Sequence, residues 1–107
     1  MKTSALDFDK MVIERSHKIP VLVELSGAGC GPCLWVEKQL IDITRARSGE
    51  WNFVSINVED FPELIEKYKI QANPTVILFQ QGEEKARLMG ALPKIAVEQW
   101  IDDQIEK

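Results

Sequence analysis

The sequence predicts one α/β domain built around a mixed β-sheet, and three observations support this prediction. Over most of the chain, apolar runs typical of buried strands alternate with amphipathic runs typical of helices. Near the C-terminus, Gln81-Gly82-Glu83 separates two strand-like runs as a hairpin turn does, which makes that pair of strands antiparallel. The 107 residues suffice for one hydrophobic core but not for two, so residues 1–107 are expected to form a single domain.

Start and stop signals divide the chain into elements. Asp7 can cap a first helix that runs to about His17. The turn residues at 48–50 end the second helix, and Pro93 suits the first turn of the last one. In chain order we expect a helix over 7–17, a strand over 20–26, a helix over 33–45, a strand over 51–58, a short helix opened by 59–62, a strand over 75–79, a strand over 84–89 and a helix from 93.

The apolar content of each run indicates how deeply it is buried. The run from Ile19 to Leu25 is apolar except at Glu24, and the run over 75–79 is apolar throughout, so both strands should lie inside the sheet. The run over 51–58 alternates, which is typical of a strand with one buried face. The last helix has an apolar stripe made of Ile95, Ala96, Val97, Trp100, Ile101 and Ile105.

Composition and charge argue against several classes of function. Hydrophobic residues make up 45% of the chain and the net charge is −4, with no basic stripe to bind nucleic acid and no polybasic membrane anchor. No apolar run approaches the length needed to cross a membrane, and Met1 to Asp7 lack the apolar core of a signal peptide. We therefore expect protein or small-thiol partners, no nucleic acid, no membrane, and a reducing, cytoplasmic location.

The most informative motif is Cys30-Gly31-Pro32-Cys33, which contains both cysteines of the chain and lies where a strand leads into a helix. A disulfide between them closes a very small loop and so stabilises the fold little, which favours reversible thiol chemistry. The positive end of the helix stabilises a thiolate at Cys30. Pro32 suits the first helical turn, and Gly31 leaves the attacked sulfur uncrowded. Cys33 lies deeper on the same helix face and is expected to stay protonated until it resolves a mixed disulfide.

The same spacing also occurs in metal sites. The chain has one histidine, His17, and it is predicted on a different helix. Two thiolates and one imidazole fall short of the four ligands of a closed zinc site within one chain. Redox chemistry is therefore favoured, while a metal or cluster shared between two copies and an inert pair remain as alternatives.

In the order and spacing of its motifs the chain resembles the thioredoxin family over nearly its whole length. The matching segments are the Cys-Gly-Pro-Cys motif, 57–59 at the end of the central strand, 73–75 before the next strand, 81–83 in the hairpin and 90–91 before the last helix. The resemblance implies the thioredoxin fold, with a mixed sheet of four to five strands flanked by helices on both faces. It also implies that Cys30 is the attacking thiol, Cys33 the resolving thiol, and Pro74 a cis proline packed against the disulfide.

Glu24 falls where the family has a buried acid beneath the resolving cysteine. A carboxyl group in a core strand should have a raised pKa, and a raised pKa suits a proton acceptor for the Cys33 thiol. The alternative is a glutamate at the edge of the core that reaches solvent. Ser55 stands where the family usually has a lysine. With no cation to favour the charged form, we expect a still higher pKa for Glu24 and a proton path that depends on water.

Other departures from the family surround the motif. Gly29 replaces an aromatic residue before the first cysteine, and Asn73 replaces an apolar residue before the proline, so the loop should be more flexible and its surface less apolar. Trp35, which follows Leu34 after the second cysteine, is either a docking contact or helix packing. The expected substrate-binding residues are Gly29, Gly31, Pro32, Asn73, Pro74 and Gly90.

These arguments predict a protein-disulfide reductase that needs no organic cofactor and no metal. Its expected partners are protein disulfides and an electron donor like thioredoxin reductase. Two other functions remain as alternatives. One is a binding or chaperone module with an incidental dithiol, which the departures at Gly29 and Asn73 favour. The other is a dimer that holds a metal or iron–sulfur cluster between paired cysteine motifs.

Overall fold

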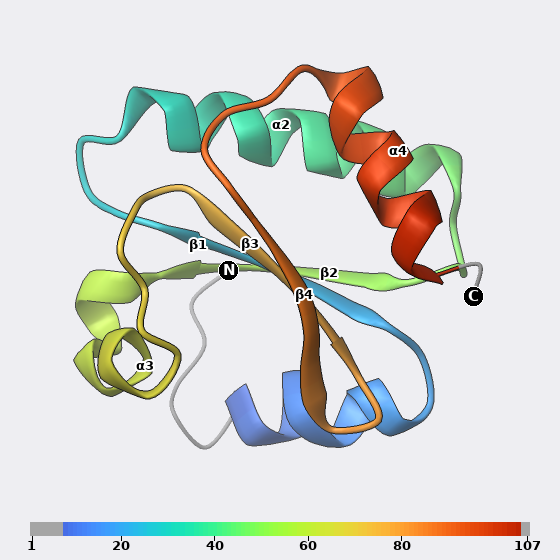
Figure 1. Ribbon diagram of the computed structural model, residues 1–107, viewed down its shortest axis with the longest axis horizontal. Coiled ribbons are helices and arrows are strands. Elements are labelled where there is room, and N and C mark those ends of the chain that lie inside the picture. Colours follow the sequence, from blue (N-terminus) through green and yellow to red (C-terminus); the bar gives the residue numbers. More distant parts are fainter. Residues whose placement is uncertain (1–7, 106–107) are drawn as a thin grey trace.

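A four-stranded mixed β-sheet forms the centre of the molecule in the computed structural model, which describes residues 8–105 (Figure 1). The strand order is β2-β1-β3-β4. Strand β1 (Val21–Ser26) pairs in parallel with β2 (Asn52–Asn57) and antiparallel with β3 (Thr75–Gln80). Strand β4 (Glu83–Met89) pairs antiparallel with β3 through the predicted hairpin. The predicted mixed sheet is confirmed, with the apolar strands β1 and β3 at its centre.

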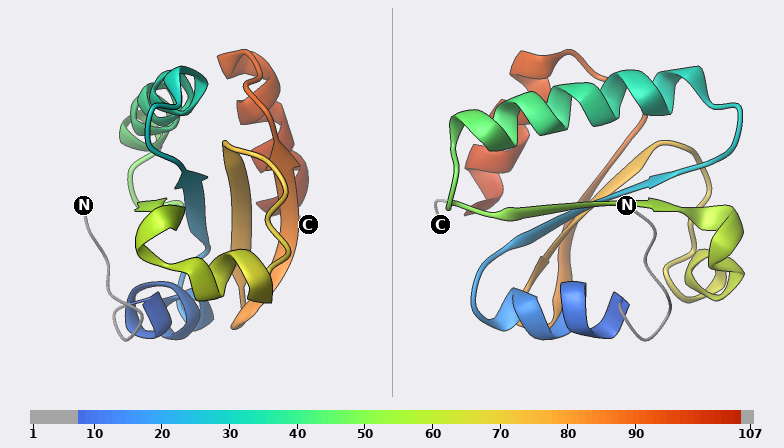
Figure 2. Two further views of the ribbon diagram at one scale, coloured as in Figure 1. Left: turned by 90° about the vertical axis from the view of Figure 1, so that its left-hand side faces the viewer. Right: turned by 180° about the vertical axis from the view of Figure 1, so that it is seen from behind.

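Helices cover both faces of this sheet, as the edge-on view in Figure 2 shows. Two helices, α2 and α4, lie on one face, and α3 and the N-terminal helical segment lie on the other (Figures 1 and 2). None of the helices within residues 8–105 is both long and apolar enough to cross a membrane. The helical elements are η1 (Asp9–Glu14), η2 (Arg15–His17), α2 (Gly31–Ala46), η3 (Val58–Asp60), α3 (Pro62–Lys67) and α4 (Lys94–Ile105).

The N-terminal segment differs from the regular α-helix expected there. Element η1 is a wide π-helical turn and η2 a tight 3-10 turn, while the proposed cap, Asp7, lies outside the described residues. Buried side chains recur here at every fourth residue, at Phe8, Val12 and Ser16. A turn wider than 3.6 residues keeps such a set on one face of the segment, which explains the local departure from α-helical geometry.

Alternation along the strands separates the core into two clusters. Successive side chains of a strand point to opposite faces. Val21, Val23 and Leu25 pack on the side of the N-terminal segment and α3, whereas Leu22 packs with residues of α2 and α4. By the same alternation Glu24 points, like Leu22, into the layer of α2 and α4. Its neighbours in the sheet are Ser55 on β2 and Val76 on β3.

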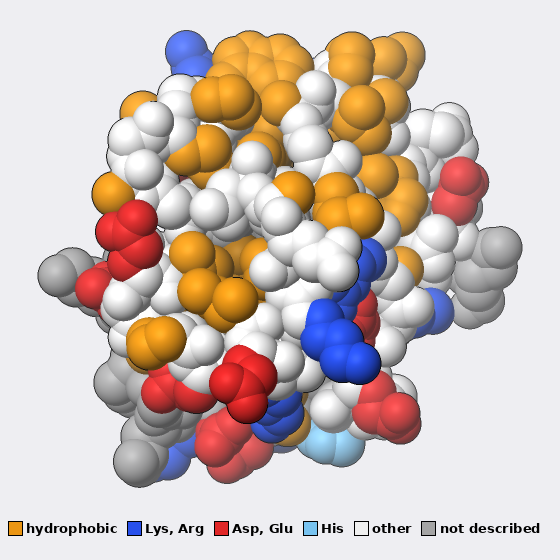
Figure 3. All heavy atoms as spheres, turned by 60° about the vertical axis from the view of Figure 1, so that its left-hand side comes forward, with side chains coloured by type: hydrophobic (Ala, Val, Ile, Leu, Met, Phe, Trp, Pro, Cys, Tyr) orange, Lys and Arg blue, Asp and Glu red, His pale blue; other side chains and the backbone are white. Residues whose placement is uncertain are grey.

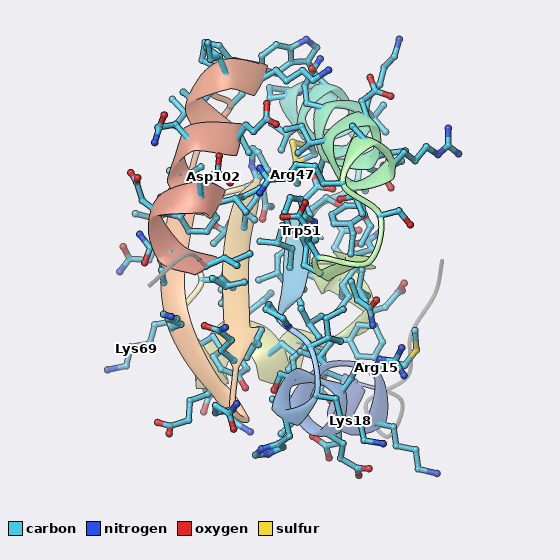
Figure 4. The ribbon with its side chains drawn as sticks, turned by 90° about the vertical axis from the view of Figure 1, so that its right-hand side faces the viewer. Arg15, Lys18, Arg47, Trp51, Lys69 and Asp102 are labelled. Carbon is cyan, nitrogen blue, oxygen red and sulfur yellow. A yellow bond between two sulfur atoms is a disulfide. The ribbon has the colours of Figure 1, made fainter. Side chains whose placement is uncertain are left out.

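The C-terminal end of α2 is fixed by a cluster around Arg47 (Figure 4). The guanidinium of Arg47 forms ion pairs with Glu50 at 2.7 Å and with Asp102 of α4 at 2.5 Å. It also lies over the ring of the buried Trp51, 5.0 Å from the centroid. The Trp51 indole N–H donates a hydrogen bond to Thr44 Oγ1 at 2.9 Å. These contacts join the C-terminal end of α2, the segment before β2 and α4, at the end of α2 opposite the cysteines.

Candidate active site

Cys30 occupies the N-cap of α2, directly after β1 and its loop. Its backbone is extended (φ −92°, ψ 97°), and its sulfur accepts a hydrogen bond from the Cys33 N–H at 3.1 Å. Pro32 lies in the first helical turn, where its lack of an N–H removes no helical hydrogen bond. The N–H groups and the positive end of the helix therefore act on the sulfur of Cys30, an arrangement that stabilises a thiolate.

The two cysteines form a disulfide, with their Cα atoms 5.3 Å apart. Their environments differ, because Cys33 is buried with 2% exposure whereas Cys30 is half-buried. An incoming thiol or disulfide therefore reaches Cys30 first. Within residues 8–105, no three histidine, cysteine or acidic side chains are grouped as metal ligands.

A cleft of about 510 Å³ opens beside the disulfide. The loop before α2, the first turns of α2 and the end of β2 form its walls. Figure 3 shows this side of the molecule, with apolar side chains gathered along the top of the face over α2 and α4. Leu34 is 69% exposed and Trp35 44%, so Trp35 lies on the surface rather than in the helix packing. The cleft is lined by Ser26, Gly27, Ala28, Gly29, Cys30, Gly31, Cys33, Leu34, Glu37 and Asn57.

Glu24 lies in the core, on the sheet face covered by α2 and α4, with none of its surface exposed, which rules out the alternative of a solvent-reaching glutamate. Its Oε1 accepts a hydrogen bond from the Ser55 hydroxyl at 3.4 Å, while Oε2 has no partner among the described residues. Burial, followed by the negative charge of Glu37, raises the pKa of Glu24 to about 8, and the Ser55 hydrogen bond opposes this shift. Ser55 stands opposite Glu24 in the sheet register and supplies no positive charge.

The loop that leads to Cys30 is held from two sides. The Ala28 N–H donates a hydrogen bond to Glu59 Oε2 at 3.2 Å. Gly27 lies so close to Asn73 that a Cβ atom added to it would be 2.7 Å from Asn73 Nδ2. Gly29, two residues after Gly27, has a φ of +69°. The glycines therefore serve a close approach and a left-handed turn, and the loop is tied down more firmly than its composition suggests.

The peptide bond between Asn73 and Pro74 is cis. Pro74 is buried, and its carbonyl accepts a hydrogen bond from the Gly90 N–H at 3.0 Å. The structure thus divides the predicted substrate-binding residues into two groups that meet where Gly27 approaches Asn73. Gly29 and Gly31 line the cleft with both cysteines, while Pro32, Asn73, Pro74 and Gly90 are not among its lining residues.

Three residues of this region were missed by the sequence analysis. Glu37 follows Cys33 by four residues, a spacing that places both on one helix face and could have revealed it. Asn57 lines the cleft, and its side chain accepts a hydrogen bond from the Glu59 N–H at 2.9 Å. The contact of Glu59 with Ala28 joins segments far apart in the chain, so no local pattern predicts it.

Comparison with known proteins identifies the family of this chain. The sequence model of the Thioredoxin family matches residues 1–103. A chloroplastic M-type thioredoxin of Triticum aestivum is 33% identical over 99 residues, covering 92% of this chain and 55% of the relative. For a chloroplastic M-type thioredoxin of Zea mays the identity is 34% over 86 residues, with 80% and 52% covered. A chloroplastic Y-type thioredoxin of Arabidopsis thaliana is 37% identical over 105 residues, with 98% and 60% covered.

The names of these relatives correct one expectation. The chain spans about half the length of the curated relatives it matches. The names of all three place them in the chloroplast, which contradicts the cytoplasmic location expected from the sequence. The expectation rested on the lack of an apolar signal core and of a membrane-spanning run, and neither feature distinguishes the cytoplasm from another compartment. Since the family match runs from residue 1 to residue 103, the chain belongs to the thioredoxin family.

Proposed function

We propose that this chain reduces protein disulfides through a cycle in which Cys30 and Cys33 alternate between a dithiol and a disulfide. The observation that carries this proposal is the unequal pair at the start of α2. The half-buried Cys30 sulfur faces the positive end of the helix, and the buried Cys33 is bonded to it. Such a pair combines an accessible, ionisable nucleophile with a protected second thiol.

The cycle transfers two electrons in two exchange steps. The Cys30 thiolate attacks one sulfur of the substrate disulfide, and the other substrate sulfur leaves as a thiolate. Cys33 then loses its proton and attacks the Cys30 sulfur, which breaks the mixed disulfide and releases the second substrate thiolate. The chain ends with the bond between Cys30 and Cys33, the form described here. A dithiol donor, for which a thioredoxin-reductase-like protein is the natural candidate, restores the two thiols.

Glu24 is the proposed acceptor of the Cys33 proton. Its side chain points into the layer of α2, where Cys33 is buried on the inward face of the helix. A pKa of about 8 lies close enough to neutrality for the carboxyl group both to take up and to release a proton. The unpartnered Oε2 leaves one oxygen available to the thiol or to an intervening water.

The substrate is proposed to dock on the surface around the motif. Exposed Leu34 and Trp35 offer apolar contact beside the reactive sulfur. Gly29, Gly31 and Pro32 leave the approach to Cys30 uncrowded. The segment containing Asn73, Pro74 and Gly90 would run beside an extended substrate segment.

Single-cysteine variants test the two roles. Cys33→Ser should accumulate mixed disulfides with protein substrates, because the resolving thiol is missing. Cys30→Ser should form none and should not reduce a model protein disulfide. The adducts are counted on non-reducing gels after incubation of the fully reduced variants with an oxidised protein substrate. Equal trapping by both variants would show that the roles are not divided as proposed.

A further inference from the structure

Glu37 is a charged residue of the cleft that the proposed cycle does not use. It lies one helical turn beyond Cys33 on α2, so the two side chains share a helix face. Both line the cleft beside the disulfide, Cys33 at its buried end and the half-buried Glu37 nearer to solvent. A carboxylate is thus built into the wall of the cleft, next to the thiol that must lose a proton.

Among the groups around Glu24, Glu37 is the charged group that shifts the pKa of Glu24. From β2 the neighbour of Glu24 is the Ser55 hydroxyl, and from β3 it is the apolar Val76. From α2 the ionisable groups that line the cleft are Cys33 and Glu37. On α4, which covers the same face of the sheet, Glu98 and Asp102 are paired with Arg47, and Lys94 and Asp103 are exposed. The negative charge of Glu37 adds to burial in favouring the protonated form of Glu24, and the Ser55 hydrogen bond only partly offsets it.

We propose that Glu37 is a positioning residue for the resolving step, whose carboxylate at the rim of the cleft controls when the buried Glu24 is free to accept the proton of Cys33. This inference rests on the acceptor role proposed for Glu24. Glu37 acts through the field that it imposes on the core carboxyl group.

The proton balance of the step shows how such control works. The S–H bond of Cys33 breaks and an O–H bond forms on Glu24, so Glu24 must have lost its proton beforehand. The charge of Glu37 opposes that loss and moves it to higher pH. The mixed disulfide with a substrate therefore persists longer at neutral pH than it would with a neutral residue at position 37.

Glu37→Gln tests the inference because it removes the charge and keeps the shape. Asp42→Asn is the matched control, since Asp42 is an exposed acid further along α2. The Glu24 carboxyl group is titrated by carbon NMR in the oxidised proteins, where no thiol titrates. The Glu24 midpoint should fall by roughly half a pH unit in Glu37→Gln and stay unchanged in Asp42→Asn.

The release of substrate from a preformed mixed disulfide is then followed against pH in a single turnover. In Glu37→Gln, the pH at which the release rate is half-maximal should fall together with the Glu24 midpoint measured by NMR. A Glu24 midpoint that stays in place, or a rate that falls at every pH with its midpoint unmoved, would overturn the role given to Glu37.

Glu24→Gln separates this failure from failure of the underlying proposal. If Glu24→Gln leaves the pH dependence of release intact, Glu24 is not the acceptor, and both roles fall. If Glu24→Gln abolishes that dependence while Glu37→Gln leaves the midpoint of release in place, the role of Glu24 stands and that of Glu37 is rejected.

Discussion

The charged groups near the two ends of α2 differ in whether they have partners of opposite charge. At the C-terminal end the guanidinium of Arg47 is paired with Glu50 and Asp102 and lies over the Trp51 ring. At the N-terminal end the carboxyl group of Glu24 is buried without any cation and with one oxygen unpartnered among the described residues. The cation at one end of α2 is therefore neutralised by ion pairs, whereas the buried acid that faces the other end has no cation beside it.

The contrast indicates that the Arg47 cluster contributes to stability and that Glu24 serves the chemistry of the site. Burying an unpaired polar group costs free energy, whereas a surface pair with good geometry costs little and adds a modest gain. A core acid that weakens the fold is therefore easier to explain by chemistry than by structure. Its side chain points into the layer of α2, the helix that begins with the cysteine motif, which supports the proposed proton transfer. The predictions below test the contrast, beginning with the largest effect.

Glu24→Gln should stabilise the protein at alkaline pH. The folded-state pKa of about 8 lies above the ordinary value of 4.5, so wild-type stability is complete at low pH and falls as pH rises through that window. A glutamine does not titrate, and the advantage of the variant should grow to about 3 to 5 kcal/mol above the folded-state pKa. Urea unfolding of the oxidised proteins across this range measures the difference. A difference that stays constant with pH would mean that Glu24 is not desolvated.

Arg47→Met should weaken the opposite end of the helix. The methionine keeps an apolar stem over Trp51 but loses the ion pairs with Glu50 and Asp102, which should lower the free energy of unfolding by about 1 to 2 kcal/mol. The loss should shrink at high salt. Arg45→Met, which changes an exposed arginine of the same helix, is the control. Equal losses in the two variants, or a fall in disulfide reduction by Arg47→Met, would break the division between the two ends.

Gly27→Ala tests whether the reactive end depends on close packing of its loop. The new methyl group would meet the Asn73 amide at 2.7 Å, so the side chain of Asn73 must move. Because that amide is the end of a flexible side chain, the stability loss should be about 1 kcal/mol or less, while reduction of protein disulfides should slow. Adding Asn73→Ala to Gly27→Ala should restore the stability to that of Asn73→Ala alone, since it removes the clashing atoms. If Gly27→Ala costs as much stability in the Asn73→Ala protein as in the wild type, the contact with Asn73 does not explain the effect.

Much of the fold could be predicted from the sequence because its signals are local. The continuous apolar runs of β1 and β3 identified the centre of the sheet, and the hairpin turn fixed the direction of β4. Glu24 was identified by its resemblance to a buried acid of the thioredoxin family, and its place in an apolar strand predicted its raised pKa. The form of η1 was not predicted, since buried residues at every fourth position fit both an α-helix and a wider turn until packing decides between them.

The contacts of the site were less predictable because they join distant segments. The hydrogen bond of Ala28 with Glu59 and the approach of Gly27 to Asn73 depend on how the loops between strands meet. A glutamate four residues after a cysteine is common on helix surfaces. Glu37 matters for the site because its negative charge raises the pKa of the buried Glu24. Sequence patterns identify the reacting groups. The electrostatic field that acts on them depends on which side chains the folded layers bring close together, which the sequence does not show.

The backbone of Gly29 also limits the evolutionary paths open to this loop. No atom lies within 4 Å of where a Cβ would stand at this position, so there is space for a large side chain. The φ of +69°, however, belongs to a region that costs an L-residue with a side chain roughly 1–2 kcal/mol. An aromatic residue, which the family resemblance predicts at this position, could therefore not be introduced here by a single neutral substitution. The loop would first have to change its course, because the present backbone favours glycine.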